Sequence, residues 1–395
     1  MDIKLSPRVQ QLKPSPTLAL TARAKALRDA GRDVIGLGAG EPDFDTPDHI
    51  KAAAVAAIEA GQTKYTPVDG TPELKAAVQA KFARENGLDY ALDEILVSCG
   101  GKHSFFNLCQ ALLSPGDEVV IPAPYWVSYP PMVELAGARP VIVAATQEQG
   151  FKLTPEQLEA AITPATRLVV INSPSNPTGA VYSEAELAAL GEVLLRHPQV
   201  VVASDDIYEH ILWGQPRFSN IVNACPELKP RTVVLNGVSK AYSMTGWRIG
   251  YAAGPKALIG AMKRIQSQST SNPASISQAA ATAALNGEQG FIQAMCAVFK
   301  RRHDAVLEAL NALPGVSCRP AEGAFYLFPD CSGAIANLGL EDDVALSEYL
   351  LEQAEVALVP GSAFGAPGHL RLSFATSQAQ LDEALARMAR VLSAL

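Results

Sequence analysis

Two short apolar runs, Thr232–Leu235 and Ile249–Ala253, flank a loop that reads Asn236-Gly-Val-Ser-Lys-Ala-Tyr-Ser-Met-Thr-Gly-Trp-Arg248. Continuous apolar runs of this length are typical of strands that are buried on both faces of a sheet. Lys240 therefore lies beside a buried sheet, among small and aromatic residues. Burial favours the neutral form of an amine, and a neutral amine is a nucleophile toward aldehydes. The loop predicts a reactive lysine, and a solvated surface lysine is the ordinary alternative.

The same loop carries groups that suit a phosphate. Arg248 offers a rigid set of donors that matches phosphate oxygens, and Ser239 adds a hydroxyl next to the lysine. An amine nucleophile and a phosphate clamp on one loop indicate a phosphorylated aldehyde, and the biological example is pyridoxal 5′-phosphate (PLP). A serine–lysine pair alone is weak evidence, so this hypothesis depends on the rest of the chain.

Most of the chain between residues 95 and 253 alternates between predicted strands and helices. The Ser183-x-x-Glu186 pattern, for example, is a capping box that predicts a helix over 183–196. This alternation predicts a doubly wound α/β fold with a seven-stranded, mainly parallel sheet flanked by helices. The predicted strands are Ile95–Ser98, Glu118–Ile121, Pro140–Ala144, Arg167–Asn172, Val200–Ser204, Thr232–Leu235 and Ile249–Ala253.

The two ends of the chain follow a different pattern. After Pro255 the predicted strands stop, two long helical stretches follow, and the tail then mixes short strands with helices. In this tail we expect strands over Ala324–Pro329, Val356–Val359 and Leu370–Phe374. We therefore predict a large α/β domain over residues 46–295 and a smaller α+β domain formed by residues 1–45 together with 296–395.

Glycine, polar and aromatic residues follow the predicted strands. In doubly wound sheets, ligands bind beyond the carboxyl ends of the strands, so these residues are candidates for a single site. Each has an ordinary structural explanation, such as a turn, a helix cap or core packing, but their joint occurrence at strand ends favours a shared site. They are Gly100, Gly101 and Lys102 after the first strand, Trp126 after the second, Asn176 after the fourth, Asp205 and Tyr208 after the fifth, and Lys240 after the sixth.

Composition and charge limit the classes of function. The chain has 395 residues, 48% hydrophobic and 18% charged, which is typical of a globular protein large enough for two domains. Its net charge of −8 and isoelectric point near 5.4 argue against nucleic acid or an anionic membrane as a partner. The N-terminus has no apolar signal segment, and six scattered cysteines show no metal-type spacing. We therefore expect a cytoplasmic protein with no metal site.

The glycine pattern near the N-terminus argues against a nicotinamide oxidoreductase. Gly36, Gly38 and Gly40 alternate and are followed by Glu41-Pro42, so the G-x-G-x-x-G spacing of dinucleotide-binding loops is not met. A regulator that kept a PLP-binding domain for ligand sensing would need a DNA-binding segment. The first 45 residues are too short to form a DNA-binding domain, and the chain is too acidic to favour DNA binding.

Together these motifs resemble those of the class I, fold-type I PLP-dependent aminotransferases, in particular the bacterial aspartate/prephenate aminotransferase branch. The likeness covers essentially the whole chain. It implies a cytoplasmic homodimer with shared active sites that moves an amino group between amino acids and 2-oxoacids by a ping-pong mechanism. The most specific segments are Ala39-Gly-Glu-Pro-Asp-Phe44, Asn176-Pro-Thr-Gly179, Ser204-Asp-Asp-Ile-Tyr-Glu209, Ser239-Lys240, Met244-Thr-Gly-Trp-Arg-Ile-Gly250 and Arg371-Leu-Ser-Phe374.

The resemblance also implies a role for each candidate residue. Lys240 is the expected covalent attachment point of PLP and the residue that moves the substrate proton. Asp205 is expected to pair with the pyridine nitrogen and keep it protonated, and Tyr208 to bind the ring hydroxyl oxygen, as the other catalytic residues. The remaining expected PLP contacts are Gly100, Gly101, Lys102, Trp126, Asn176, Ser239, Arg248 and Tyr65 of the partner subunit.

The resemblance also implies which residues bind the substrate. Arg371 is expected to hold the substrate α-carboxylate bidentately, and a buried salt bridge is the alternative role for this arginine. Lys102, with Lys13 on the N-terminal arm, is expected to select a dicarboxylic donor such as L-aspartate. Alternatively, Lys102 only offsets phosphate charge. The predicted substrate-binding residues are Gly40, Trp126, Asn176, Arg371, Lys102 and Lys13.

The expected reaction moves the amino group of L-aspartate to 2-oxoglutarate, and prephenate is a further candidate substrate. Other functions of the same fold differ only in their contacts with the substrate side chain. An aromatic or alanine aminotransferase, or another PLP enzyme such as a β-lyase, therefore stays open as an alternative.

Overall fold

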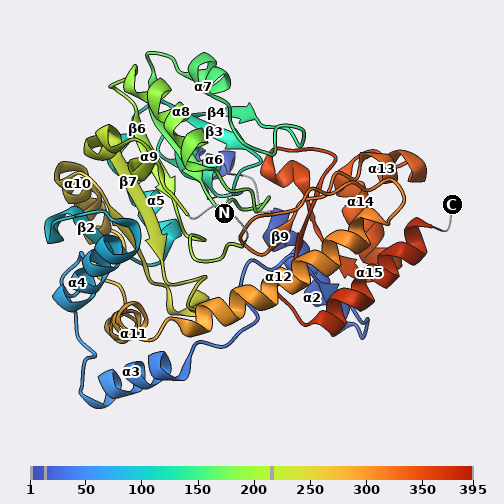
Figure 1. Cartoon of the computed structure of the whole chain (residues 1–395), viewed down its shortest axis with the longest axis horizontal. Helices are drawn as coiled ribbons and strands as arrows, with labels where there is room; N and C mark the ends of the chain where they lie inside the picture. Colours follow the sequence, from blue (N-terminus) through green and yellow to red (C-terminus); the bar gives the residue numbers. More distant parts are fainter. Residues whose placement is uncertain (1–2, 13–15, 214–217, 394–395) are drawn as a thin grey trace.

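The computed structural model describes residues 3–12, 16–213 and 218–393. All seven predicted strands form, and they make one sheet with the order β2-β8-β7-β6-β5-β3-β4 (Figure 1). Only β8 runs antiparallel to its neighbours in this sheet, so the mainly parallel α/β prediction is confirmed. The strands are β2 (Ile95–Ser98), β3 (Glu118–Ala123), β4 (Arg139–Ala144), β5 (Thr166–Asn172), β6 (Val201–Asp205), β7 (Thr232–Gly237) and β8 (Gly250–Ala253).

Helices cover both faces of the large sheet, which explains why its strands are continuous apolar runs. In β3, Val120 packs into the core on one face, while Val119 and Ile121 pack into the core on the other. The first face is covered by α3 (Asp48–Glu59), α4 (Pro72–Lys81), α7 (Pro155–Ala161), α8 (Glu184–Leu195), α9 (Ile221–Ala224) and α11 (Ser275–Asn286). The second face is covered by α5 (Gly101–Leu112), α6 (Tyr129–Leu135) and α10 (Lys256–Ser267).

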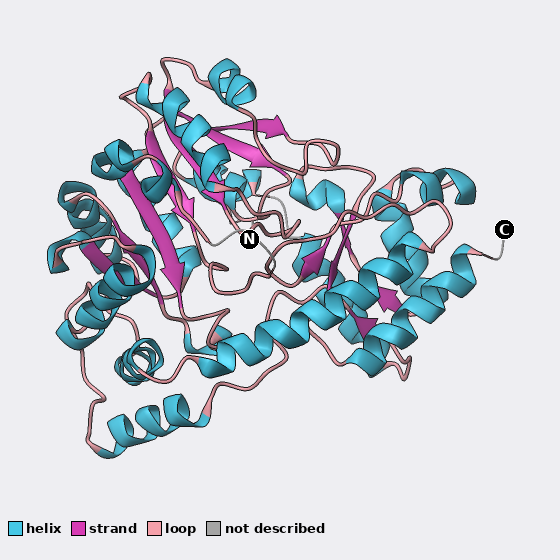
Figure 2. Ribbon diagram, viewed as in Figure 1, coloured by secondary structure: helices cyan, strands magenta, loops and turns pink. Residues whose placement is uncertain are grey.

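A separate hydrophobic core lies in the right half of Figure 2, around two small sheets. Strands β1 (Ile35–Gly36) and β10 (Val356–Ala357) pair in parallel, and β11 (Val359–Pro360), β12 (Leu370–Ser373) and β9 (Tyr326–Leu327) form an antiparallel sheet. The helices of this half are α2 (Pro16–Asp29), α12 (Gly290–Asn311), α13 (Ser332–Leu338), α14 (Asp343–Tyr349) and α15 (Gln378–Leu392).

The remaining helical elements are short. They are α1 (Pro7–Gln11), η1 (Phe82–Asn86), η2 (Leu92–Glu94), η3 (Pro226–Arg231), η4 (Thr245–Trp247), η5 (Leu350–Ala354) and η6 (Gly361–Phe364). No helix in the described part of the chain has both the length and the hydrophobicity needed to cross a membrane.

The single strand expected over Val356–Val359 is wrong, because the structure divides this run between two sheets. Val356 pairs with Ile35 of the N-terminal segment, whereas Val359 pairs with Arg371. Leu358 lies between the two strands and is buried in the second core. The apolar pattern of residues 356–359 is continuous because both parts of this run are buried. The pattern does not indicate which strand each part pairs with.

The helix α12 connects the two halves of the molecule. Near its start, Ile292 packs into a core of the large sheet, and three residues later Met295 packs into the second core. Tyr208, which follows β6 of the large sheet, also packs into the second core. The carboxyl end of β6 therefore lies where the two cores meet.

Gly250 is required where β8 meets the start of α5. A Cβ atom at this position would overlap the backbone of Gly100 and Gly101, with the Cα of Gly101 2.8 Å away. Because backbone cannot yield as a side chain can, we expect Gly250→Ala to lower the free energy of unfolding by about 1–3 kcal/mol in urea titrations. Gly260→Ala is the control, because its Cβ would meet no atom within 4 Å. Because Gly260 lies within a helix, Gly260→Ala should raise the free energy of unfolding by about 0.5–1 kcal/mol. Equal stabilities of the two variants would contradict this packing argument.

Candidate active site

A cavity of about 430 Å³ lies at the carboxyl edge of the large sheet. Its walls come from the loops after β2, β3, β5, β6 and β7, and from the segment after β1. Arg248 reaches the same edge because it precedes β8, the strand that runs in the opposite direction. The candidate residues that line the cavity are Gly40, Gly101, Lys102, Trp126, Asn176, Asp205, Tyr208, Ser239, Lys240 and Arg248.

Three candidates among the described residues do not line the cavity. Gly100 lies behind Arg248, and a Cβ there would come within 2.9 Å of the guanidinium carbon. Arg371 is buried next to the cavity wall and contacts Asn176. Tyr65 is 92% exposed, away from the cavity of its own chain. Lys13 lies outside the described residues.

The amine of Lys240 is held within the cavity wall. Its Nζ donates a hydrogen bond to the backbone oxygen of Gly40, at 2.5 Å. Burial lowers the pKa of this lysine to about 8, and the positive charge of Arg371 acts in the same direction. A substantial fraction of Lys240 is therefore neutral near physiological pH, as a nucleophile or a general base requires.

Asp205 ends β6, lines the cavity and is buried. Its carboxylate accepts hydrogen bonds from the hydroxyl of Tyr129 and from the backbone N–H of Ile207. Burial raises the pKa of Asp205 above its ordinary value, because these partners do not fully replace water. A cationic nitrogen placed against this carboxylate would offset that cost. Tyr129, which begins α6, was missed by the sequence reasoning.

Tyr208 links the large sheet to the small antiparallel sheet. Its hydroxyl lies 2.8 Å from the hydroxyl of Tyr326, which belongs to β9. Burial raises the pKa of Tyr208 well above its ordinary value, so the phenol stays protonated and can donate a hydrogen bond. Tyr326 was also missed, since a buried tyrosine in a predicted strand has no distinguishing sequence signal.

Arg371 is a buried cation for which no Asp or Glu within the described ranges serves as a partner. Its guanidinium donates to Asn176 Oδ1 at 2.9 Å and to the backbone oxygen of Gly38 at 2.6 Å, and its Nε has no partner. The guanidinium also stacks against the rings of Tyr326 and Phe364. The salt-bridge alternative for Arg371 is therefore not observed. A buried charge without a counterion is costly, so this position suits the carboxylate of a ligand.

Phosphate-type donors gather at another side of the cavity. The helix α5 begins at Gly101, and the first N–H groups of a helix have no partner within it. The hydroxyl of Ser239 and the guanidinium of Arg248 line the same cavity. Two backbone oxygens, those of Thr245 and Cys99, hold the guanidinium at 2.9 and 3.3 Å. These groups could hold a phosphate.

Lys102 lies beside Trp126, with its Nζ 5.1 Å from the centre of the indole ring. Burial lowers the pKa of Lys102, and the nearby charge of Arg248 lowers it further. No carboxylate of the described chain contributes to this shift. Lys102 is therefore a second cation that could accept a carboxylate or a phosphate from a ligand.

Three more polar residues of the cavity wall were missed, namely Asn172, Thr245 and Glu41. Asn172 accepts a hydrogen bond from the backbone N–H of Asn176 and donates one to the backbone oxygen of Asp205, both at 2.9 Å. It therefore joins the loops after β5 and β6. Thr245 donates to a carboxylate oxygen of Glu41 at 2.9 Å. Asn172 could have been found as the last residue of a predicted parallel strand, the position that Asp205 has in β6.

The lowered pKa of Lys240 predicts an unusual reactivity. In cofactor-free protein, an amine-selective reagent should label Lys240 with a pH midpoint of about 8. Ordinary surface lysines should titrate near 10.4, because only the neutral amine reacts. Peptide mass spectrometry across a pH series measures both classes in one sample. A midpoint for Lys240 equal to that of the surface lysines would show that the site does not desolvate this amine.

Comparison with known proteins agrees with this geometry. The family model for class I and II aminotransferases matches residues 32–388. The aspartate/prephenate aminotransferase of Nitrosomonas europaea is 58% identical over 397 residues, which cover 99% of this chain and 100% of the relative. The crystal structure of the aspartate aminotransferase from Rhizobium meliloti superposes with a TM-score of 0.95, at 52% identity over 99% of each chain.

A structure of the Thermus thermophilus aspartate aminotransferase with maleate superposes with a TM-score of 0.93, at 47% identity over 99% of this chain and 100% of the other. The family match and these similarities extend over nearly the whole length of the chain, including every loop that forms the cavity. This chain therefore belongs to the class I and II aminotransferase family.

Proposed function

We propose that this aminotransferase uses PLP bound to Lys240 and takes its amino group from L-aspartate, with 2-oxoglutarate as acceptor and prephenate as a further substrate. The observation that carries the proposal is the position of the Lys240 amine, between a buried arginine that has no counterion and a cluster of phosphate-type donors. The names of the relatives in Nitrosomonas europaea and Rhizobium meliloti support the choice of aspartate and prephenate.

The residues of the cavity fit PLP. Ser239, Arg248 and the start of α5 would hold its phosphate, and the Asp205 carboxylate would face its ring nitrogen. When bound, PLP supplies an electron-withdrawing ring that makes the α-hydrogen of an amino acid acidic. The carboxylate of Asp205 would gain the cationic partner that its buried position lacks.

Four side chains would bind the substrate, move its proton or support the groups that do so. Arg371 binds the α-carboxylate through two parallel hydrogen bonds, for which its Nε is available. Asn176 fixes the orientation of that guanidinium. Lys240, whose pKa is lowered to about 8, would move a proton between the substrate α-carbon and the aldehyde carbon of PLP, in one direction in the first half of the cycle and in the other in the second. Tyr208 stays protonated and donates a hydrogen bond into the cavity.

The second carboxylate of the substrate is assigned to Lys102. This cation lines the cavity beside Trp126, so it can be reached from inside the site. The maleate in the Thermus thermophilus structure is a four-carbon dicarboxylate like aspartate, which supports an acidic substrate. Lys13 is proposed as an additional cation on the basis of the sequence alone, because it lies outside the described residues.

We also propose a homodimer of two-domain subunits. Tyr65 is an almost fully exposed aromatic residue, and in a dimer Tyr65 of the partner subunit would complete the phosphate site. The proposed domains are residues 46–295 and residues 1–45 with 296–395. The passage of α12 from one core to the other between Ile292 and Met295 supports this boundary, and the pairing of β1 with β10 supports the inclusion of the N-terminal segment.

The absorption spectrum of the purified protein tests the cofactor and the donor together. PLP bound to Lys240 should give a visible absorption band, and L-aspartate without any oxoacid should remove the band while oxaloacetate appears. Lys240→Ala should lose the covalent band. A band that persists with aspartate and responds to tyrosine or alanine would replace the dicarboxylic donor with another amino acid. No band after incubation with PLP would reject the proposed cofactor.

Lys102→Ala separates substrate selection from phosphate binding. Because a hydrogen bond to a charged group contributes about 1.5–3 kcal/mol, we expect KM for aspartate to rise about tenfold or more. KM for alanine, which has no second carboxylate, should change little. The dissociation constant of PLP is the control, and Lys102→Arg should retain part of the selectivity. Equal changes for aspartate and alanine would assign Lys102 to the phosphate instead.

A further inference from the structure

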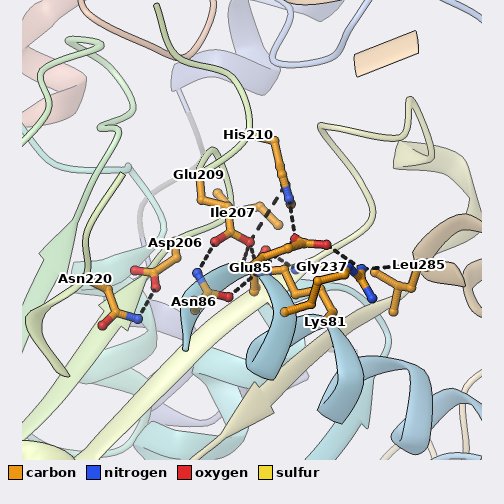
Figure 3. A network of polar contacts seen from close by, with 12 residues as sticks. Lys81, Glu85, Asn86, Asp206, Ile207, Glu209, His210, Asn220, Gly237 and Leu285 are labelled. Atoms are coloured by element: carbon orange, nitrogen blue, oxygen red, sulfur yellow. Dashed lines mark hydrogen bonds and ion pairs between the residues drawn. The ribbon is translucent and has the colours of Figure 1, made fainter. Parts of the chain in front are cut away.

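A buried polar network surrounds Glu209 (Figure 3), and its side chains Lys81, Asn86, Glu209 and Asn236 are not among the residues that line the cavity. The carboxylate of Glu209 is the centre of this network and is only 5% exposed. It accepts hydrogen bonds from the ammonium of Lys81 on α4, from Asn86 Nδ2 at 2.7 Å and from Asn236 Nδ2 at 2.7 Å. His210 and Glu85 form a second pair at the edge of the network.

Lys81 and Glu209 form a buried ion pair within this network. Lys81 is completely buried and pairs with Glu209, and Asn86 Oδ1 accepts a further hydrogen bond from its ammonium at 2.7 Å. Burial alone would raise the pKa of Glu209, but the charges of Lys81 and His210 hold it below the ordinary value. Glu85, Glu209 and His210 lie close enough together to suggest a metal site, but the Lys81 ammonium already supplies the cation.

A buried ion pair is weak evidence for stability, because the cost of desolvating both charges offsets their attraction. The position of Glu209 in the chain indicates a different role. Glu209 follows Tyr208 directly and lies on the segment that begins with Asp205. Its partner Asn236 lies near the end of β7, four residues before Lys240. The hydrogen bond between them therefore joins the two segments that carry the three candidate catalytic residues.

Both ends of the Asn236 side chain are fixed. Its Nδ2 donates to Glu209, and its Oδ1 accepts the backbone N–H of Gly237 at 2.7 Å. Asn236 is 2% exposed, so no water competes for these bonds. A displacement of the Glu209 carboxylate would therefore be passed directly to the backbone that enters the Lys240 loop.

We propose that Glu209, neutralised by Lys81, is a positioning residue that holds the Lys240 loop in place through Asn236. Glu209 thereby keeps the amine of Lys240 desolvated and fixes its position relative to the Tyr208 side chain. A catalytic role for Glu209 rests on the proposed function. The coupling between Glu209 and Lys240 involves only residues of this chain, so it can be measured without cofactor.

Two double variants isolate the hydrogen bond from the buried charges. Lys81→Met with Glu209→Gln removes both charges and keeps an acceptor for Asn236. Lys81→Met with Glu209→Met removes both charges and the acceptor, with a side chain of similar size. In cofactor-free protein, the labelling midpoint of Lys240 should stay near the wild-type value of about 8 in the glutamine pair. In the methionine pair it should rise by about 1 unit, because a looser loop lets water reach the amine.

The same pairs should differ in activity with PLP and aspartate, with kcat/KM lower by about tenfold in the methionine pair only. Equal labelling midpoints in the two pairs would overturn the positioning role. A difference in midpoint without any PLP band in the wild-type protein would instead reject the proposed function and leave the link to Lys240 standing.

A second set of variants applies if the methionine pair does not fold. Asn236→Ala removes the same hydrogen bond with the ion pair intact. Asn86→Ala removes the other amide donor to Glu209. Asn86 lies outside both segments that carry the candidate catalytic residues. We expect the Lys240 midpoint to rise in Asn236→Ala and to stay unchanged in Asn86→Ala, with circular dichroism confirming the fold of both. Identical midpoints in these two variants would also overturn the proposal.

Discussion

The desolvation of one lysine amine is the constraint on which the arrangement of the site depends. A buried sheet, a carbonyl oxygen from the segment after β1 and the charge of Arg371 all act on Lys240. Gly40, which supplies the carbonyl oxygen, and Arg371 both lie far from the lysine in the sequence. The amine is neutral often enough to react only because the fold brings them together and excludes bulk water.

The local charge of the site is opposite to that of the whole chain. The protein carries a net charge of −8, but Lys102, Arg248 and Arg371 gather around Lys240. At short range these cations dominate the potential, since exposed charges beyond about 10 Å are screened by salt. A small dianion can therefore enter a site on an acidic protein. The clearest sign of that preference is that Arg371 has no Asp or Glu partner among the described residues.

The site is shared between the two cores. Arg371 comes from β12 of a small sheet and donates to Asn176, which follows a strand of the large one. Tyr208 follows β6 and meets Tyr326 on β9. The arrangement of these side chains is thus set by how the two halves pack together. In contrast, the Lys81–Glu209–Asn236 network lies within the large half, where it joins the loops after β6 and β7.

Local sequence patterns were sufficient to predict the large sheet and most of the candidate residues. Strands buried on both faces must be continuously apolar, and a parallel sheet must bring the residues after its strands to one edge, so local patterns were sufficient. Asp205, Asn176 and Lys240 could be found in this way, and the cavity does bring them together.

Only the tertiary structure decided the contacts that join distant parts of the chain. Tyr208 and Tyr326 are 118 residues apart, and neither has a local signal that predicts the other. The same reason applies to Tyr129 at Asp205, to the missing counterion of Arg371 and to the division of the run 356–359 between two sheets. Hydrophobic patterns report that a residue is buried, but the choice of its partner depends on packing between elements that the pattern does not describe.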